Sequence, residues 1–268
     1  MSDMIRSCRG RGFTLVELLI TVAIIGVLAA MLAPALAGAF READRVVCAS
    51  NLRQVGLALR AYLNDHDGWC FPLYDPPEPG DTGRNWYFGW EPNGSPARGE
   101  GHRILERSKA KLAPYLGDTE ALACPAVPFR GPYKPKFQGR PWTYGINRHL
   151  SSHPSPAKGD VNGNGNAHFS RFTGRDASRT VVFADAAQVV THLAPASPSR
   201  PMVECFPYIE PERPYVHFRH MGKANVLFAD WHVEACEPAP GSFDSRLPEA
   251  KIGHLDPETY RYRPQDDG

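Results

Sequence analysis

The longest apolar stretch of the chain covers residues 12–40. Its side chains are almost all those of Leu, Ile, Val, Ala, Phe and Met, and only one, Glu17, is ionisable. About 20 apolar helical residues, each rising about 1.5 Å, cross the hydrocarbon core of a bilayer. The pattern therefore predicts a membrane-spanning helix over residues 13–40.

The predicted helix continues beyond the apolar stretch. In residues 41–64 apolar side chains recur at steps of three and four, which lines one helical face: Cys48, Leu52, Val55, Leu59 and Tyr62 or Leu63. We expect this half of the helix to be exported and to pack under a globular head formed by residues 65–268.

The head shows only short periodic segments. The chain has 26 Pro and 24 Gly, which favour loops and turns over long regular elements. We expect a short helix over residues 103–116, a short strand over 142–147, and two core strands over 180–185 and 225–230. The last two both end in Phe-Ala-Asp, and we expect their terminal carboxylates at the same edge of the sheet. The predicted fold is α+β, with a long N-terminal helix on a loop-rich head that contains an antiparallel sheet.

Charge before the apolar stretch predicts the orientation. Three arginines stand there against one acid, Asp3, and the positive-inside bias keeps such a segment cytoplasmic and sends the rest outward. The basic segment ends in a small residue, Gly12, before the apolar run rather than after it as in a secretory signal peptide. A cut there would remove residues 1–12 as a cytoplasmic leader and keep the helix.

Other features exclude function classes. The net charge is +1 and no basic run follows Arg11, so we expect no nucleic-acid partner. Activated Ser or Cys nucleophile motifs, glycine loops for phosphate and HExxH helices are missing from the sequence, so we expect no enzyme.

Five cysteines follow the leader segment. Outside the cytoplasm they could form up to two disulfides, and spacing alone does not give the pairing. The first candidate joins Cys48, on the inner face of the helix, to Cys124, and the second joins Cys205 to Cys236. A set of free buried thiols is the alternative. Because no CxxC occurs, a zinc knuckle is not expected.

Glu17 is an acid inside the apolar stretch. An intramembrane carboxylate costs a few kcal/mol or more unless it is paired. The available partner is an α-amine freed at Phe13, on a neighbouring copy more easily than on the same chain. Such a pair would fix the axial register of assembling helices.

Two sets of residues could bind a cation. Asp160, Asn162 and Asn164 open a calcium-loop pattern, but Arg171 stands where the bidentate Glu belongs, and a simple Asn/Gly turn is the alternative.

The second set is Asp185, His220, Asp230 and His232, whose carboxylates and imidazoles suit a divalent transition metal. The alternative is structural: His220 caps a hairpin or donates to Asp230 across two strands.

The junction Gly-Phe-Thr-Leu-Val-Glu at residues 12–17 resembles the processing site of type IV prepilins and type II secretion pseudopilins. This resemblance implies cleavage after Gly12 by a prepilin peptidase, N-methylation of Phe13 and an assembly role for Glu17.

The rest of the chain is similar to a large group of bacterial prepilin-like proteins named for a C-terminal His, nine residues and Asp-Gly. In this chain His220 is the His of that motif and Asp230 is its Asp. Trp231 replaces the Gly, which puts a turn with positive φ at this point in doubt. The other similar segments are residues 48–59, Cys124-Pro125, Tyr-Gly-Ile-Asn at 144–147, and Phe-Ala-Asp followed by His232.

The resemblance implies a structural subunit of a pilus-like or pseudopilus-like assembly. Its partners would be the peptidase, other pilin-like subunits, an assembly ATPase and a platform protein. It would lie in the bacterial inner membrane as a single-pass protein with a periplasmic or extracellular head. No cofactor is firmly implied beyond the calcium or transition metal considered above. The alternative is a membrane-anchored exported enzyme or metal-binding domain that uses this N-terminus for delivery only.

Overall fold

The computed structural model describes residues 13–74, 82–117, 123–127, 131–139, 142–151 and 167–263. The chain divides into two compact units, Met1–Glu42 and Ala43–Gly268, which we call the N-terminal unit and the head unit. The first helix, α1 (Leu15–Asp65), contributes residues to both.

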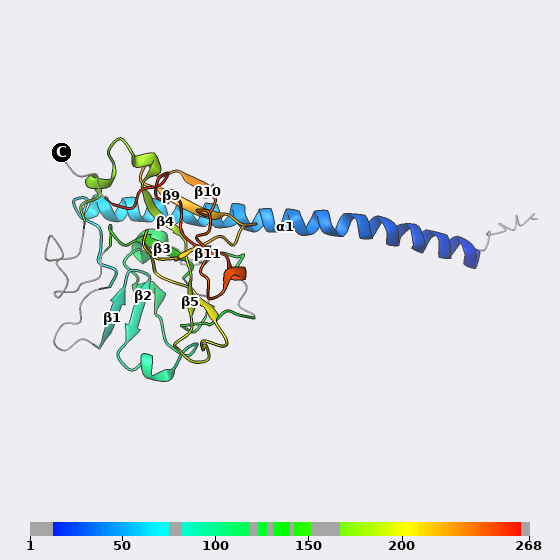
Figure 1. Cartoon of the computed structure of the whole chain (residues 1–268), viewed down its shortest axis with the longest axis horizontal. Helices are drawn as coiled ribbons and strands as arrows, with labels where there is room; N and C mark the ends of the chain where they lie inside the picture. The colour runs from blue at the N-terminus through cyan, green and yellow to red at the C-terminus, as the bar shows by residue number, and fades with distance from the viewer. Residues whose placement is uncertain are drawn as a thin grey trace, which may run out of the picture. The chain divides into compact units, whose positions relative to one another are not determined.

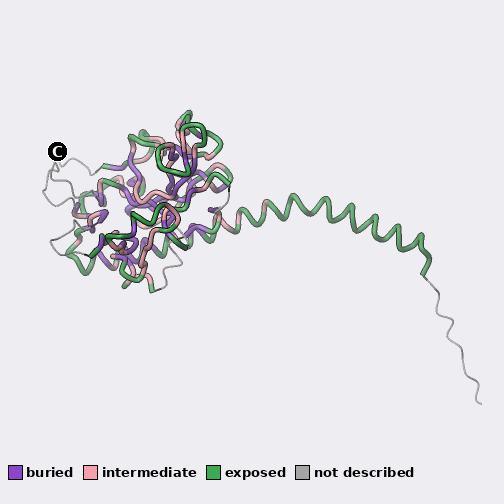
Figure 2. The backbone as a smooth tube through the Cα atoms, turned by 90° about the horizontal axis from the view of Figure 1, so that it is seen from below, coloured by how far each residue is buried: buried purple, intermediate pink, exposed green. Residues whose placement is uncertain are grey.

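In the N-terminal unit, α1 exposes nearly all of its side chains. Residues 13–37 are all exposed, and they include the large apolar side chains of the stretch predicted to span a membrane (Figure 2). Of the helices in the described residues, α1 is the one long and apolar enough to cross a membrane. An apolar surface of this size is stable only in lipid or against other apolar surfaces.

In the head unit, the rest of α1 packs onto the sheet, as predicted. Its buried residues are Cys48, Ala49, Leu52, Val55, Gly56, Ala58, Leu59, Tyr62 and Leu63. The closest approach is at Gly56, where an added Cβ would lie 2.9 Å from a methyl carbon of Leu227. Since Leu227 is itself fully buried, a larger side chain at Gly56 would force the helix and the sheet apart.

A five-stranded sheet forms the centre of the head unit, in the order β10-β9-β4-β3-β7 (Figure 1). Three of these strands, β3, β4 and β9, confirm the predicted ones. All neighbours are antiparallel except β3 and β7, which are parallel and were not expected. The strand bounds are β3 (Tyr144–Asn147), β4 (Val181–Asp185), β7 (Tyr208–Ile209), β9 (Ala224–Phe228) and β10 (Val233–Cys236).

The remaining elements are short. The paired strands are β1 (Gly83–Trp86) with β2 (Gly89–Pro92), β5 (Gln188–Val190) with β6 (Met202–Glu204), and β8 (Val216–His217) with β11 (Ile252–Gly253). The helices are η1 (Pro96–Arg98), η2 (Arg107–Lys109), α2 (Ala113–Leu116), η4 (Phe169–Phe172), η5 (Ala177–Arg179) and η6 (Pro248–Ala250).

The helix predicted over residues 103–116 is wrong in extent. Only α2 is α-helical there, and the turn before it is the separate 3₁₀ turn η2. Pro114 lies in the first turn of α2. Proline lacks an N–H and clashes with the preceding helical turn, so a helix can begin just before Pro114 but cannot run through it unperturbed.

The expectation that Asp185 and Asp230 share a sheet edge is also wrong. Strands β4 and β9 are antiparallel, with Ala184 opposite Val226. Asp185 therefore lies near the start of β9, whereas Asp230 follows its end. Equal sequence endings place two side chains at one edge only when the strands are parallel.

The turn between β9 and β10 keeps the positive φ that the glycine-containing motif requires. Trp231 has φ 73° and stacks on Phe169, with ring centroids 4.9 Å apart. Left-handed backbone costs a non-glycine residue roughly 1 kcal/mol or more.

We expect Trp231→Gly to be about 1 kcal/mol more stable than Trp231→Ala, since both variants lose the ring and only Ala keeps the backbone strain. Urea unfolding of the two detergent-solubilised proteins measures the difference. Equal stabilities would mean that the turn relaxes out of the left-handed region.

Candidate functional site

Three hydrogen bonds between Thr14 and Glu17 cap the start of α1. The N–H and the hydroxyl of Thr14 donate to Glu17 Oε2 at 2.9 and 2.8 Å, and the N–H of Glu17 donates to Thr14 Oγ1 at 3.2 Å. This is a capping box, whose sequence signature is Thr-x-x-Glu. Glu17 therefore has a partner within its own chain, although these bonds leave its charge in place. Pairing with a neighbouring Phe13 amine stays a prediction.

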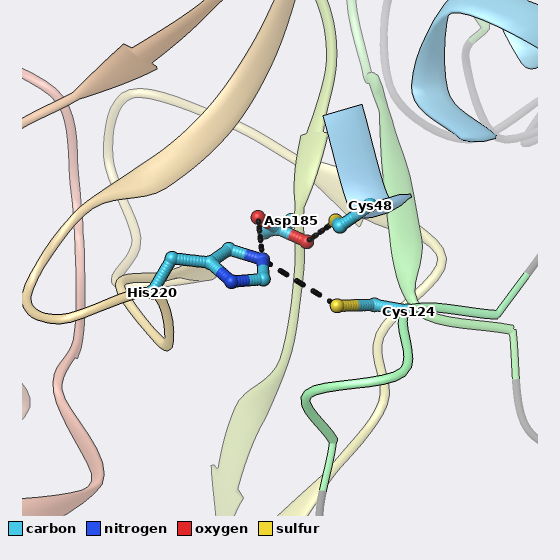
Figure 3. A group of neighbouring side chains, drawn as sticks. All are labelled: Cys48, Cys124, Asp185 and His220. Carbon is cyan, nitrogen blue, oxygen red and sulfur yellow. Dashed lines mark hydrogen bonds and ion pairs between the residues drawn. The ribbon is translucent and has the colours of Figure 1, made fainter. Parts of the chain in front are cut away.

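A second group of chemically active side chains lies inside the head unit. Cys48, Cys124, Asp185 and His220 bring one donor atom each to within 4.8 Å of one another, and all four residues are buried (Figure 3). We call this group the Cys-Cys-Asp-His cluster. His220 Nε2 lies 3.2 Å from Asp185 Oδ2 and 3.4 Å from Cys124 Sγ. The thiol of Cys48 donates to Asp185 Oδ1 at 3.2 Å.

Four different segments position these side chains. Cys48 lies on the sheet-facing side of α1, and Asp185 is the last residue of β4. The N–H of Cys124 donates to Thr143 Oγ1 at 2.7 Å, which fixes the loop before Pro125. His220 opens a tight turn, exchanging two backbone hydrogen bonds of 3.0 Å with Lys223.

Interactions with neighbouring groups outweigh the effect of burial on the pKa of three of the four groups. Burial would raise the pKa of Cys124, yet hydrogen bonds with Cys48 and His220 lower it to about 6. Burial would lower the pKa of His220, but Asp185 and Cys124 raise it to about 9. Despite its burial, Asp185 has a lowered pKa because of the nearby Arg219 charge and its bond with His220. For Cys48, burial dominates and raises the pKa well above its ordinary value.

Residues around the Cys-Cys-Asp-His cluster add one positive charge and further hydrogen bonds. Arg219 Nε lies 3.7 Å from Asp185 Oδ1 with both side chains buried, and its NH2 group donates to the carbonyls of Thr143 and Ala186. The N–H of Asn225 donates to Asp185 Oδ2 at 2.8 Å, and the hydroxyl of Tyr144 donates to Cys48 Sγ at 3.4 Å. Among the described residues, His220 Nδ1 has no hydrogen-bond partner although it is buried.

The cluster joins two predictions that the sequence kept apart. Cys48 and Cys124 were expected to form a disulfide, and Asp185 and His220 were half of a candidate metal set. The structure places the two pairs together, with both cysteines as free thiols, so the expected disulfide is not present.

Asp230 and His232 lie elsewhere. His232 Nδ1 contacts Asp230 Oδ1 at 2.5 Å in a half-exposed pair, because the turn at Trp231 separates both from the interior. His220 contacts Asp185 rather than Asp230, so the expected His220–Asp230 pair is wrong.

The second expected disulfide is not present either. Cys205 packs at the side of the cluster of buried residues around α1, whereas Cys236 belongs to a separate buried cluster with Phe228 and Tyr262. Both are free thiols. The candidate calcium ligands Asp160, Asn162 and Asn164, and the processing residue Gly12, lie outside the described residues.

A small pocket of about 70 Å³ lies between the β1–β2 hairpin and residues 133–137 and 205–207. Its walls are mainly aromatic: Trp86, Phe88, Tyr133, Phe137, Trp142 and Phe206. Phe88 and Trp142 are buried and pack on Tyr87. The aromatic residues near β1 therefore serve mostly as core, and the pocket brings few polar groups together.

Comparison with known proteins identifies the N-terminal segment. Residues 8–33 match a family model described as the prokaryotic N-terminal methylation motif. No curated protein and no solved structure matches the chain. The chain thus carries a prepilin-type N-terminal methylation motif on a long apolar helix that is followed by an α+β head unit, an arrangement consistent with a type IV pilin-like protein.

Proposed function

We propose that the protein is a structural subunit of a pilus-like or pseudopilus-like assembly. The observation that carries this proposal is the methylation motif at residues 8–33, which opens a helix whose apolar side chains are exposed over residues 15–40. A prepilin peptidase cuts the chain after Gly12 and methylates the new N-terminus at Phe13. The protein then waits in the inner membrane with its head outside.

Assembly exchanges lipid for neighbouring helices. Lipid tails are as apolar as these side chains, so bundling gains little hydrophobic free energy and depends on packing and on polar pairs. An assembly ATPase, acting through a platform protein, supplies the work that moves subunits out of the membrane. In this proposal the protein has no catalytic role of its own.

Mass spectrometry of the N-terminus, on protein from its native membrane, tests the processing step. We expect a chain that begins at Phe13 and carries one added methyl group. A Gly12→Asp variant should keep residues 1–12, because a large charged residue replaces the small one at the cut, and a Gly26→Ala variant, with nothing within 4 Å of the added Cβ, should be processed normally. An intact Met1 in the native protein would contradict the proposal.

The second candidate function is an exported, anchored domain that never polymerises. The Cys-Cys-Asp-His cluster favours it, since a pure packing role does not require four reactive side chains in one place. Processing at Gly12 is compatible with both functions. Cross-linking of the mature protein to copies of itself or to other pilin-like subunits supports the first and excludes the second.

A further inference from the structure

We propose that Cys48, Cys124, Asp185 and His220 bind one zinc ion that fastens α1 to the head. All four belong to the head unit, and the inference does not depend on whether the protein polymerises.

The distances fit a tetrahedral ion. Zinc bonds of about 2.3 Å to sulfur and about 2.0 Å to nitrogen or oxygen hold neighbouring ligand atoms about 3.3 to 3.8 Å apart. Two contacts between these ligand atoms, 3.2 Å from Cys48 Sγ to Asp185 Oδ1 and 3.4 Å from Cys124 Sγ to His220 Nε2, lie close to that range. One donor atom from each of the four residues lies within 4.8 Å of the other three. The side chains of His220 and the two cysteines point toward one another from opposite sides, with Asp185 between them (Figure 3).

The donor types select the metal. Two thiolates and an imidazole suit zinc, whereas calcium and magnesium prefer sites made of oxygen. All four residues are buried, so the site is closed in the way that structural zinc sites are, without a position open to substrate.

The charges also balance. Zinc binding needs both cysteines as thiolates and His220 without a proton on Nε2, so any proton that these three groups carry leaves to solvent. Two thiolates and the Asp185 carboxylate then carry three negative charges, which the two charges of zinc and the buried guanidinium of Arg219 cancel. Without the ion, the second thiol must stay protonated beside Asp185.

Neighbouring groups are placed to support the ligands. Asn225 donates its N–H to one oxygen of Asp185, which leaves the other oxygen free to bind, and Tyr144 donates to Cys48 Sγ. Such bonds orient the atoms that hold a metal.

Two other uses of the cluster fit less well. Cys124, His220 and Asp185 resemble a nucleophile, a base and an orienting acid, but Cys124 is only 1 % exposed, so no substrate reaches its sulfur. A disulfide between Cys48 and Cys124 would leave Asp185 and His220 without a role and would need an oxidant.

Metal analysis of the full chain tests the proposal. The protein is purified in mild detergent without chelators, and its zinc is measured by elemental mass spectrometry. We expect close to one zinc per chain in the wild type and less than about a tenth of that in Cys124→Ser and His220→Ala. Cys236→Ser and His232→Ala are the matched controls, and both should keep the wild-type content.

Cobalt keeps the test valid if the ligand variants misfold. After zinc is removed from wild-type protein by a chelator, added Co²⁺ should give the intense visible absorption of a tetrahedral site with a thiolate charge-transfer band. Added Zn²⁺ should abolish the visible absorption and the charge-transfer band, and added Mg²⁺ should leave both unchanged. A wild-type protein that binds no zinc even after Zn²⁺ is added, a native Cys48–Cys124 disulfide, or full zinc in both ligand variants would overturn the proposal.

Discussion

Chains with Glu17→Leu or Glu17→Gln are expected to be processed normally yet to enter the assembly at least about tenfold less often than wild type. An unpaired charge in lipid costs a few kcal/mol, and about 1.4 kcal/mol corresponds to tenfold in an equilibrium. The charge of Glu17 destabilises the single subunit in the membrane, and a neighbour's Phe13 amine would relieve that cost in the assembly. Neutral side chains at this position remove the difference that favours assembly.

The Gln variant separates this role from helix capping. A Gln side chain can still accept the hydrogen bonds from Thr14 but has no charge. Thr14→Val is the reverse control, because it removes the hydroxyl and keeps the carboxylate, and its incorporation should stay within about fivefold of wild type, since a helix cap typically contributes about 1 kcal/mol. The measurement is the fraction of mature protein cross-linked to neighbouring subunits. Normal incorporation of Glu17→Gln would show that the carboxylate acts only as a cap.

Lys134→Met is expected to lower the free energy of unfolding by about 3 to 5 kcal/mol. The Lys134 ammonium is fully buried and contacts the carboxylates of both Glu100 and Glu204, and Glu204 is itself only 1 % exposed. Lys136 remains 3.3 Å from Glu204 but is partly exposed and cannot replace the lost ammonium. The variant would leave a carboxylate buried without its main counter-charge, which is far more costly than losing a surface ion pair.

Chemical unfolding of the detergent-solubilised protein measures the effect, and two variants control it. Lys223→Met removes a half-exposed pair with Glu237 and should cost less than about 1 kcal/mol. Adding Glu204→Gln to Lys134→Met removes the buried charge and should recover part of the loss. A deficit below 1 kcal/mol at neutral pH would show that water reaches Glu204.

The elements that the sequence predicted correctly are those set by local pattern. Steps of three and four in residues 41–64 gave the buried face of α1, and β-branched runs gave β4 and β9. The direction of a strand is set by its connections and not by its composition. The shared Phe-Ala-Asp ending therefore could not tell whether Asp185 and Asp230 lie at the same edge of the sheet. The helix predicted over residues 103–116 was wrong in extent, and Pro114 is a local signal against it because proline disrupts the interior of a helix.

The sequence predicted only part of the Cys-Cys-Asp-His cluster. Cys48 with Cys124 was predicted as a pair, and Asp185 and His220 were two members of a four-residue metal set, but nothing local connects residue 48 with residue 220. Their meeting depends on α1 lying across the sheet. A contact of His220 with Asp230 across two strands was one of the structural alternatives, whereas Asp230 lies half-exposed in the turn after β9 and pairs with His232. The capping box could have been found, since Thr-x-x-Glu is a local signature.

The tight contact between Gly56 and Leu227 also bears on how the chain matures. Under the proposed function the head is exported after synthesis from the N-terminus, so the inward face of α1 would be made early and its cover on β9 would arrive only after most of the chain has crossed. Contacts between residues so distant in sequence form late and slowly. The emerging subunit therefore carries an uncovered apolar strip through translocation, and holding factors outside the membrane would act in that interval.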